Sequence, residues 1–144
     1  MSLKQISVFV ENKPGKMQHL TQVLADNNVD MRALSLAETS DFGIVRIIVD
    51  DVYAASTLLK DEGFIHTVNK VLGIAIPDEP GGLNTVLAIL MESAINVEYM
   101  YAFMGGKDVN HAYMIFRVED RKAAVAALGA KGIRCLDHEE LASL

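Results

Sequence analysis

Two copies of one short turn decide the fold of this chain: Asn12-Lys13-Pro14-Gly15-Lys16-Met17 and Asp78-Glu79-Pro80-Gly81-Gly82-Leu83. Each copy follows an alternating apolar run and precedes an amphipathic helical pattern, so it predicts a turn from a strand into a helix. The copies lie 66 residues apart. An internal repeat with a fixed period indicates that the chain is built from two similar structural units.

The repeat extends well beyond the turn. At the same offset, Leu20 aligns with Val86 and Leu24 with Leu90, at the apolar positions of two expected helices. Further along the offset becomes 69, and the aligned pairs are Asp51 with Asp120, Ala54-Ala55 with Ala123-Ala124, and Gly63-Phe64 with Gly132-Ile133. An insertion of three residues around Gly105-Gly106-Lys107 accounts for the change of offset.

The apolar pattern predicts the same order of elements in each half. In the first half we expect strands at 6–10, 29–37, 44–49 and 64–68, and helices at 17–24 and 52–59. In the second half we expect strands at 71–76, 95–104, 112–118 and 133–136, and helices at 83–94 and 121–129. Asp50 or Asp51 can cap the second helix, and Gly63 suits the left-handed position that ends it. A turn is expected at Gly105-Gly106-Lys107-Asp108, and Asn69-Lys70 is the candidate linker.

The order β-α-β-β-α-β, used twice, predicts an α+β fold of two ferredoxin-like repeats. Each repeat would place its two helices on one face of an antiparallel four-stranded sheet, with domains at residues 1–69 and 70–144. A unit of this size buries too little surface to be stable alone. Apolar residues make up 51% of the chain. We therefore expect the halves to pack on each other or on a second chain, which favours a homodimer.

Charge and composition exclude several classes of partner. The net charge is −6, and no cluster of Lys and Arg occurs of the kind that binds a phosphate backbone, so DNA and RNA are not expected partners. No apolar run reaches the length of a membrane span, and the first residues do not resemble a signal peptide. Cys135 is the single cysteine, so no intrachain disulfide is expected. These features favour the cytoplasm and exclude a membrane partner.

The repeated pattern resembles the ACT domain. A D/N-x-P-G-x-L/M turn after the first strand, within a β-α-β-β-α-β order, occurs over about Ile6–Val68 and again over about Val71–Leu136. The resemblance implies a small regulatory module that binds amino acids or similar metabolites and commonly accompanies enzymes of amino-acid metabolism. It also implies that domains pair side by side, with ligands at the seam between them. This chain looks like a stand-alone tandem of two such domains.

The turn has a physical reason to bind an amino acid. The first N–H groups of a helix have no partner within the helix, and the partial positive charge there favours a carboxylate. Glycine allows a ligand to approach the backbone, and proline stiffens the turn before binding. The candidate residues are Glu11, Asn12, Lys13, Pro14, Gly15 and Lys16 in the first copy, and Asp78, Glu79, Pro80, Gly81, Gly82 and Leu83 in the second. The ammonium would be held by Glu11 or Asn12, or by Asp78 or Glu79.

The resemblance also implies that a ligand meets the second strand of a neighbouring domain. The candidate residues there are Leu36, Ala37 and Glu38 in the first repeat and Tyr101, Ala102 and Phe103 in the second. Simpler interpretations remain open. A Pro-Gly pair after a strand is ordinary turn chemistry. The strand 97–104, which is rich in Tyr and Met, can equally pack in a core or against a second subunit.

The sequence carries no pattern typical of a catalytic or metal site. The histidines, His19, His66, His111 and His138, are scattered without metal-binding spacing, so neither a metal nor a cofactor is expected. His19 lies near the first turn and is interpreted as a solvated helix residue, with contact to a ligand as the alternative. Cys135 is interpreted as a core thiol, and Asp137-His138-Glu139-Glu140 as a solvated tail. No phosphate loop, dinucleotide fingerprint or nucleophile elbow occurs, which favours a protein that is not an enzyme. Two alternatives stay open: a regulatory subunit bound permanently to an enzyme, and a small enzyme on a ferredoxin-like scaffold.

Overall fold

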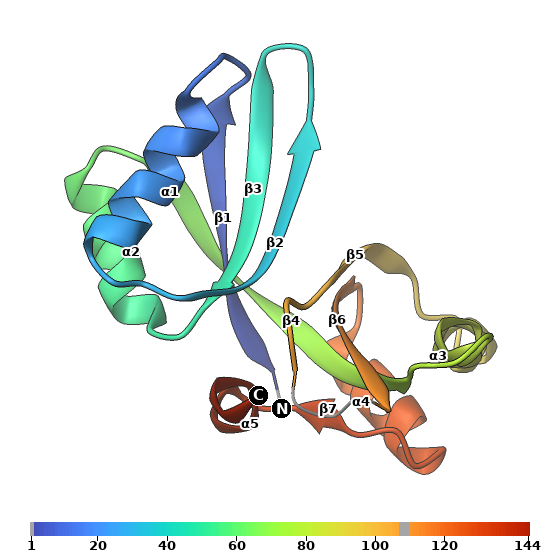
Figure 1. The fold of residues 1–144 in the computed structure, drawn as a ribbon. Helices are drawn as coiled ribbons and strands as arrows, with labels where there is room; N and C mark the ends of the chain where they lie inside the picture. Colours follow the sequence, from blue (N-terminus) through green and yellow to red (C-terminus); the bar gives the residue numbers. More distant parts are fainter. Residues whose placement is uncertain (1, 107–109) are drawn as a thin grey trace. The chain divides into compact units, whose positions relative to one another are not determined.

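A computed structural model describes residues 2–106 and 110–144 of the chain (Figure 1). The expected turn residues Lys107 and Asp108 lie outside the described residues. The described residues form two compact units, which are called here the first unit, Lys4–Asn69, and the second unit, Lys70–Leu144 with residues 2–3. The elements are β1 (Leu3–Glu11), α1 (Lys16–Asp26), β2 (Met31–Glu38), β3 (Phe42–Val49), α2 (Val52–Asp61), β4 (Ile65–Pro77), α3 (Gly82–Glu92), β5 (Val97–Ala102), β6 (His111–Val118), α4 (Arg121–Ala130), β7 (Cys135–Leu136) and α5 (His138–Ser143).

The first unit is an antiparallel sheet in the order β2-β3-β1-β4, with α1 and α2 side by side on one face (Figure 1). The register places Val8 opposite Val45 and Leu34 opposite Ile47. Alternate residues of each strand therefore point toward the helices, as the period of a strand requires. Leu20 of α1 packs against them in one buried cluster.

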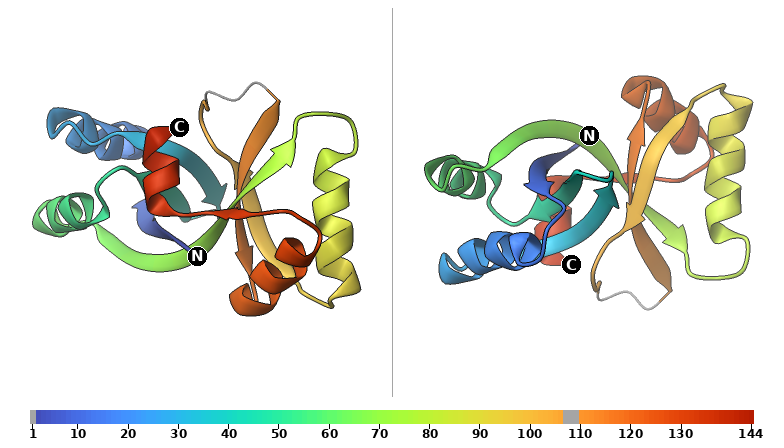
Figure 2. Two further views of the ribbon diagram at one scale, coloured as in Figure 1. Left: turned by 90° about the horizontal axis from the view of Figure 1, so that it is seen from below. Right: turned by 90° about the horizontal axis from the view of Figure 1, so that it is seen from above.

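The second unit repeats this arrangement in the order β5-β6-β4-β7, with α3 and α4 on one face of its sheet (Figure 2). Its core includes Val86, Leu90 and Phe116, of which the first two are the repeat partners of Leu20 and Leu24. Each unit thus has the strand order 2-3-1-4 of a ferredoxin-like repeat. The predicted fold of two such repeats is confirmed.

Helix caps follow the sequence closely in both repeats. The carboxylates of Asp51 and Asp120 accept hydrogen bonds from the N–H groups three residues later, at 3.0 Å in each case, and so cap α2 and α4. Gly63 and Gly132 follow these helices with φ angles of 80° and 78°. Glycine adopts this left-handed conformation without the steric cost that a Cβ imposes. Local chemistry therefore ends both helices where it was predicted.

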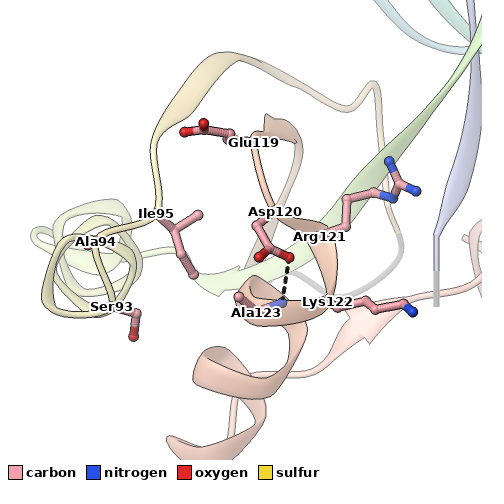
Figure 3. A pocket seen from close by; sticks show the side chains of 8 residues that line it. All are labelled: Ser93, Ala94, Ile95, Glu119, Asp120, Arg121, Lys122 and Ala123. Atoms are coloured by element: carbon pink, nitrogen blue, oxygen red, sulfur yellow. Dashed lines mark hydrogen bonds between the residues drawn. The ribbon is translucent and has the colours of Figure 1, made fainter.

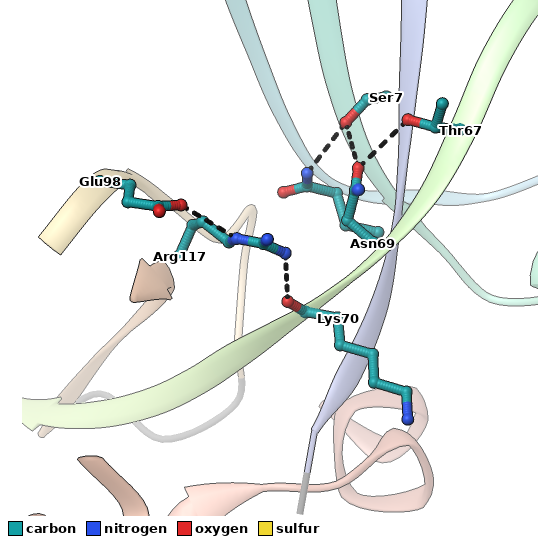
Figure 4. Close-up of polar contacts among 7 residues, drawn as sticks. Ser7, Thr67, Asn69, Lys70, Glu98 and Arg117 are labelled. Atoms are coloured by element: carbon teal, nitrogen blue, oxygen red, sulfur yellow. Dashed lines mark hydrogen bonds and ion pairs between the residues drawn. The ribbon is translucent and has the colours of Figure 1, made fainter. Parts of the chain in front are cut away.

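The expected linker at Asn69-Lys70 is wrong. Both residues lie inside β4, which runs without a break from Ile65 to Pro77. Within the first unit, the hydroxyl of Ser7 donates to Oδ1 of Asn69 at 2.9 Å, and within the second, Nη1 of Arg117 donates to the carbonyl of Lys70 at 3.1 Å (Figure 4). Polar residues are compatible with a strand when their groups find partners of this kind. Composition alone did not reveal those partners.

The C-terminal segment also differs from expectation. Residues 138–143 form the helix α5, where a solvated tail was predicted. The side chain of Asp137 accepts from the N–H of Glu140, and the side chain of Glu140 accepts from the N–H of Asp137, which is a capping box. Leu141 is 1% exposed. A reciprocal cap and one buried anchor residue are what order this short segment.

A strained residue gives a testable prediction for stability. Ala94 follows α3 with a φ of 54°, and its repeat partner Asn28 follows α1 with a φ of 57°. Asparagine tolerates this region better than alanine does. We expect Ala94→Asn to raise the free energy of unfolding by about 0.5–1 kcal/mol and Asn28→Ala to lower it by a similar amount, both measured by urea denaturation. A loss of stability in Ala94→Asn would contradict this interpretation.

Candidate functional site

The two turns share one backbone geometry. Gly15 and Gly81 have φ angles of 86° and 87°. The turn hydrogen bonds recur in pairs: Asn12 N to Asp41 O with Asp78 N to Asn110 O, Lys13 N to Glu11 O with Glu79 N to Pro77 O, and Lys16 N to Lys13 O with Gly82 N to Glu79 O. Members of a pair differ in length by at most 0.2 Å. The duplicated turn seen in the sequence is therefore a duplicated structure.

Both turns leave a helix start without a side-chain cap. Among the described residues, the N-cap positions of α1 and α3 are Gly15 and Gly81, and neither helix has a side-chain cap hydrogen bond there. The helices α2, α4 and α5 each begin with a capping aspartate instead. Uncapped N–H groups at a helix start favour an anionic partner. The two repeated turns are thus the helix starts best suited to a carboxylate.

Charged side chains surround the first turn. Glu11 accepts from Nζ of Lys13 at 2.8 Å and lies 3.9 Å from Nζ of Lys16. The hydrogen bond and the positive charge of Lys13 lower the pKa of Glu11, and the same contact raises the pKa of Lys13. Both groups are therefore charged at neutral pH. All three side chains are solvent-exposed, so their mutual attraction contributes little to stability.

Asn12 ties the first turn to the hairpin that follows β2. Its Nδ2 donates to the carbonyl of Thr39 at 3.1 Å. The predicted residues Leu36, Ala37 and Glu38 lie at the end of β2 next to that hairpin, and Leu36 is 51% exposed. These three residues do not line the cavity that opens beside the first turn, which is described below. Their expected role, contact with a ligand held by a neighbouring domain, stays a prediction.

In the second turn, Gly82 and Leu83 have packing roles. A Cβ on Gly82 would lie 2.1 Å from the carbonyl oxygen of Pro77, so only glycine fits there. Leu83 packs against the second unit's core. Asp78, Glu79 and Pro80 are exposed.

The predicted strand residues of the second repeat divide between two environments. Tyr101 and Phe103 are buried, at 8% and 7% exposure, while Ala102 is exposed. Tyr101 stacks on Tyr99 at 6.4 Å between ring centroids, and Phe103 meets Tyr113 edge-on at 6.2 Å. These ring contacts favour packing as the role of this strand, which was the simpler interpretation from sequence.

A cavity of about 340 Å³ opens beside the first turn, within the first unit. Its lining includes two of the predicted residues, Glu11 and Lys16. The others come from β1, α1, β3, the segment after α2 and the start of β4: Phe9, Val10, His19, Phe42, Glu62, Gly63, Phe64 and Ile65. The imidazole of His19 stacks on the ring of Phe64 at 5.3 Å. From the sequence, His19 was expected to be a solvated helix residue, with contact to a ligand as the alternative; it is exposed and lines this cavity. The contribution of Phe64 was missed, and the aligned Gly63-Phe64 pair was the signal that could have drawn attention to it.

A cavity of about 470 Å³ occupies the corresponding place in the second unit. Six of its lining residues are repeat partners of residues that line the first cavity: Ala75 of Phe9, Pro77 of Glu11, His111 of Phe42, Gly132 of Gly63, Ile133 of Phe64 and Arg134 of Ile65. The fold therefore creates a hollow at the same position in both repeats. Of the second turn's predicted residues, 78–83, none lines this cavity.

A larger hollow of about 600 Å³ lies between the end of α3 and the start of α4 (Figure 3). It is at the end of the sheet opposite to the second turn. Asp120 lines this hollow and caps α4 by accepting a hydrogen bond from the N–H of Ala123. The side chains of Arg121 and Lys122 extend away from Ser93 (Figure 3). None of the predicted site residues contributes to it.

Cys135 lies in the second unit's core and is 1% exposed. Burial raises the pKa of its thiol, so the reactive thiolate is scarce at neutral pH. We expect Cys135 in the native protein to react with a thiol reagent at pH 8 more slowly than in urea by a factor of more than roughly ten. Equal rates in both conditions would show that the segment around Cys135 opens freely.

Among residues 2–106 and 110–144, no group of three or more His, Cys, Asp or Glu is placed to hold a metal ion.

Comparison with known proteins agrees with this architecture. A family described as "ACT domain pair" matches residues 1–144. The solved structure of protein BT0572 from Bacteroides thetaiotaomicron is 37% identical, with a TM-score of 0.91 over 100% of this chain and 98% of that chain. The regulatory subunit of aspartate kinase from Thermus thermophilus, in its ligand-free form, is 14% identical, with a TM-score of 0.61 over 88% of this chain and 90% of that chain. The regulatory subunit of aspartate kinase from Thermus flavus is 15% identical, with the same TM-score and coverage. A search among curated proteins found no match.

The fold and the repeated turn define a tandem of two ferredoxin-like repeats, and the family match covers all of it. The chain belongs to the ACT domain pair family. The resemblance noted in the sequence is confirmed. In the described part of the structure, no helix has the length and apolar character needed to cross a membrane.

Proposed function

We propose that this protein is a non-catalytic regulatory protein that binds a free amino acid or a similar small metabolite. The observation that carries the proposal is the coincidence of two features in the first repeat. The helix start after Gly15 lacks a side-chain cap among the described residues, and a cavity adjoins it. A carboxylate placed there would accept the N–H groups that other helices of this chain offer to an aspartate.

Charge around the first turn suits recognition of a zwitterion. Lys16 and His19 line the cavity on α1, and Glu11 and Glu62 line it from β1 and the end of α2. A ligand with one carboxylate and one ammonium thus meets both signs of charge. The pKa of Glu11 is lowered and that of Lys13 raised. Proton transfer needs a pKa near the working pH, so this pair is better suited to binding than to catalysis.

The proposed regulation follows from ligand-dependent packing. A ligand shifts an equilibrium between two arrangements only through different affinities for them. We propose that the domains divide at residues 69 and 70 and that the chain forms a homodimer in the cytoplasm. In that dimer a neighbouring domain would offer the end of its second strand, Leu36–Glu38 or Tyr101–Phe103, to the ligand. Sedimentation equilibrium tests the dimer directly.

A thermal-shift screen against the twenty amino acids tests the function. At 100 times its Kd, a ligand stabilises the fold by roughly 2.7 kcal/mol, which gives a clear rise in Tm. We expect a rise with one or a few amino acids. We expect no rise with the amine that lacks the carboxylate of an active amino acid, because the helix start would then have no anion to bind. Equal shifts with both compounds would contradict the proposed role of the turn.

A permanent regulatory subunit is the second candidate, and exposed apolar side chains favour it. Tyr53 on α2 and Met91 on α3 are 84% and 71% exposed. Aromatic and Met side chains are enriched at protein interfaces. The regulatory subunit of aspartate kinase, which shares only the fold with this chain, is a precedent for an enzyme partner. Purification of an enzyme with this protein, together with no response to any amino acid, would favour this candidate.

A further inference from the structure

The two cavities lie at the same place in their repeats, but their linings differ. Phe9, Phe42 and Ile65 of the first are replaced by Ala75, His111 and Arg134 in the second. Two aromatic rings and one branched aliphatic side chain thus become a methyl group and two polar side chains. The backbone of the turns is unchanged between the repeats. The difference therefore affects what each cavity can hold and not how it is built.

The apolar lining of the first cavity is unusually accessible. Phe9 is 41% exposed, Phe42 is 54% exposed and Ile65 is 73% exposed. Apolar side chains gathered at a cavity mouth, with a few charged groups beside them, are typical of small-molecule sites. The volume of about 340 Å³ lies at the small end of the range of about 300–1,000 Å³ for ligand pockets. A ligand of amino-acid size suits it better than a dinucleotide or a peptide.

In the second cavity, residues of the C-terminal helix form part of the wall. Glu140, Ser143 and Leu144 line it. The carboxylate of Glu140 accepts from Nη1 of Arg134 and from the N–H of Asp137, so a carboxylate of the chain itself already engages the guanidinium at this place. At the repeat offset, the corresponding residues are Val71, Ile74 and Ala75, which lie in strand β4 and belong to the second unit, so the lining of the first cavity has no equivalent of this helix.

We infer that each chain binds one amino acid with an apolar, preferably aromatic, side chain, in the cavity of the first repeat. This inference rests on the proposed function and adds the ligand class, the repeat and the stoichiometry. The ligand side chain packs against Phe9, Phe42 and Ile65, while Lys16 and the start of α1 receive its carboxylate. The second cavity does not take this ligand, because Ala75, His111 and Arg134 replace the three large apolar side chains, and because Glu140 already accepts a hydrogen bond from Arg134.

Isothermal titration of the full chain with phenylalanine, leucine, aspartate and glycine tests the inference. We expect phenylalanine or leucine to bind with one ligand per chain, and aspartate and glycine to bind at least tenfold more weakly. Loss of apolar contacts in a pocket reduces affinity by about 10- to 200-fold, which sets this scale. Two ligands per chain, or tighter binding of aspartate or glycine, overturns the inference and leaves the proposed function intact. If none of the four binds and none of the twenty amino acids raises Tm in the thermal-shift screen, both the inference and the proposed function are defeated.

Matched variants exchange one residue between the two repeats. Phe42→His gives the first cavity the residue of the second, and His111→Phe does the reverse. We expect Phe42→His to weaken binding of phenylalanine or leucine at least tenfold and His111→Phe to change it less than about threefold. Equal losses in the two variants overturn the inference. The inference is also overturned if Phe42→His binds the ligand unchanged but has a different oligomeric state in sedimentation. That result would show that the exposed ring of Phe42 packs against a second copy of the chain. Circular dichroism confirms that both variants are folded.

Discussion

Replacement of Gly82 by alanine is expected to destabilise the protein more than any other single methyl group added to a glycine of this chain. The new Cβ would lie 2.1 Å from the carbonyl oxygen of Pro77, which is a backbone atom and cannot rotate away as a side chain could. Overpacking of this kind costs about 1–3 kcal/mol and sometimes more, and we expect about 3 kcal/mol in urea denaturation. Because α3 begins at this residue, the loss should affect the second unit's core first.

Gly129 provides the matched control for that measurement. It lies inside α4, and a Cβ added there meets no described atom within 4 Å. Alanine is the better helix former, so Gly129→Ala should raise the free energy of unfolding by about 0.5–1 kcal/mol. The two variants add the same group to the same unit with opposite expected signs. A similar change in both would show that the contact between Gly82 and Pro77 does not determine the start of α3.

Gly15→Val should abolish the response of the protein to its amino acid in a thermal-shift assay. At a φ of 86° a β-branched residue is strongly disfavoured, at a cost of about 1–2 kcal/mol, so the turn must change its conformation. A changed turn moves the N–H groups at the start of α1 away from the ligand carboxylate. No described atom lies within 4 Å of a Cβ at this position, so we expect the rest of the fold to survive.

Gly81→Val is the control, because Gly81 has the same conformation in the second repeat, with a φ of 87°. It should lower Tm by a similar amount and leave the ligand response in place, if the first repeat alone binds. Loss of response in Gly81→Val would argue for sites in both repeats. Retention of the response in both variants would show that the turns serve only as scaffold.

Much of the fold could be predicted because local chemistry determines it. Asp51, which the sequence offered together with Asp50 as the cap of α2, and the helix-ending Gly63 act within a few residues of their own position. The repeat aligned Asp51 with Asp120, which caps α4. The repeat strengthened these predictions, because each local pattern occurs at the matching position of both halves. The linker prediction at Asn69-Lys70 was wrong because it was based only on the polarity of the pair. The groups that satisfy these residues in β4 belong to Ser7 and Arg117, which are distant in sequence.

The candidate site could be predicted only in part, for the same reason. Glu11 and Lys16 were identified because they belong to the turn. Phe42 and Phe64, which complete the cavity, come from other elements, and only the folded sheet brings them beside the turn. The interpretation of residues 137–140 as a solvated tail missed α5, since Leu141 reveals its anchoring role only by its burial.

The two turns share their main-chain hydrogen bonds, whereas the side chains at the paired hollows differ in size and polarity. The two repeats of one chain can therefore be compared with each other in every assay at identical concentration and temperature.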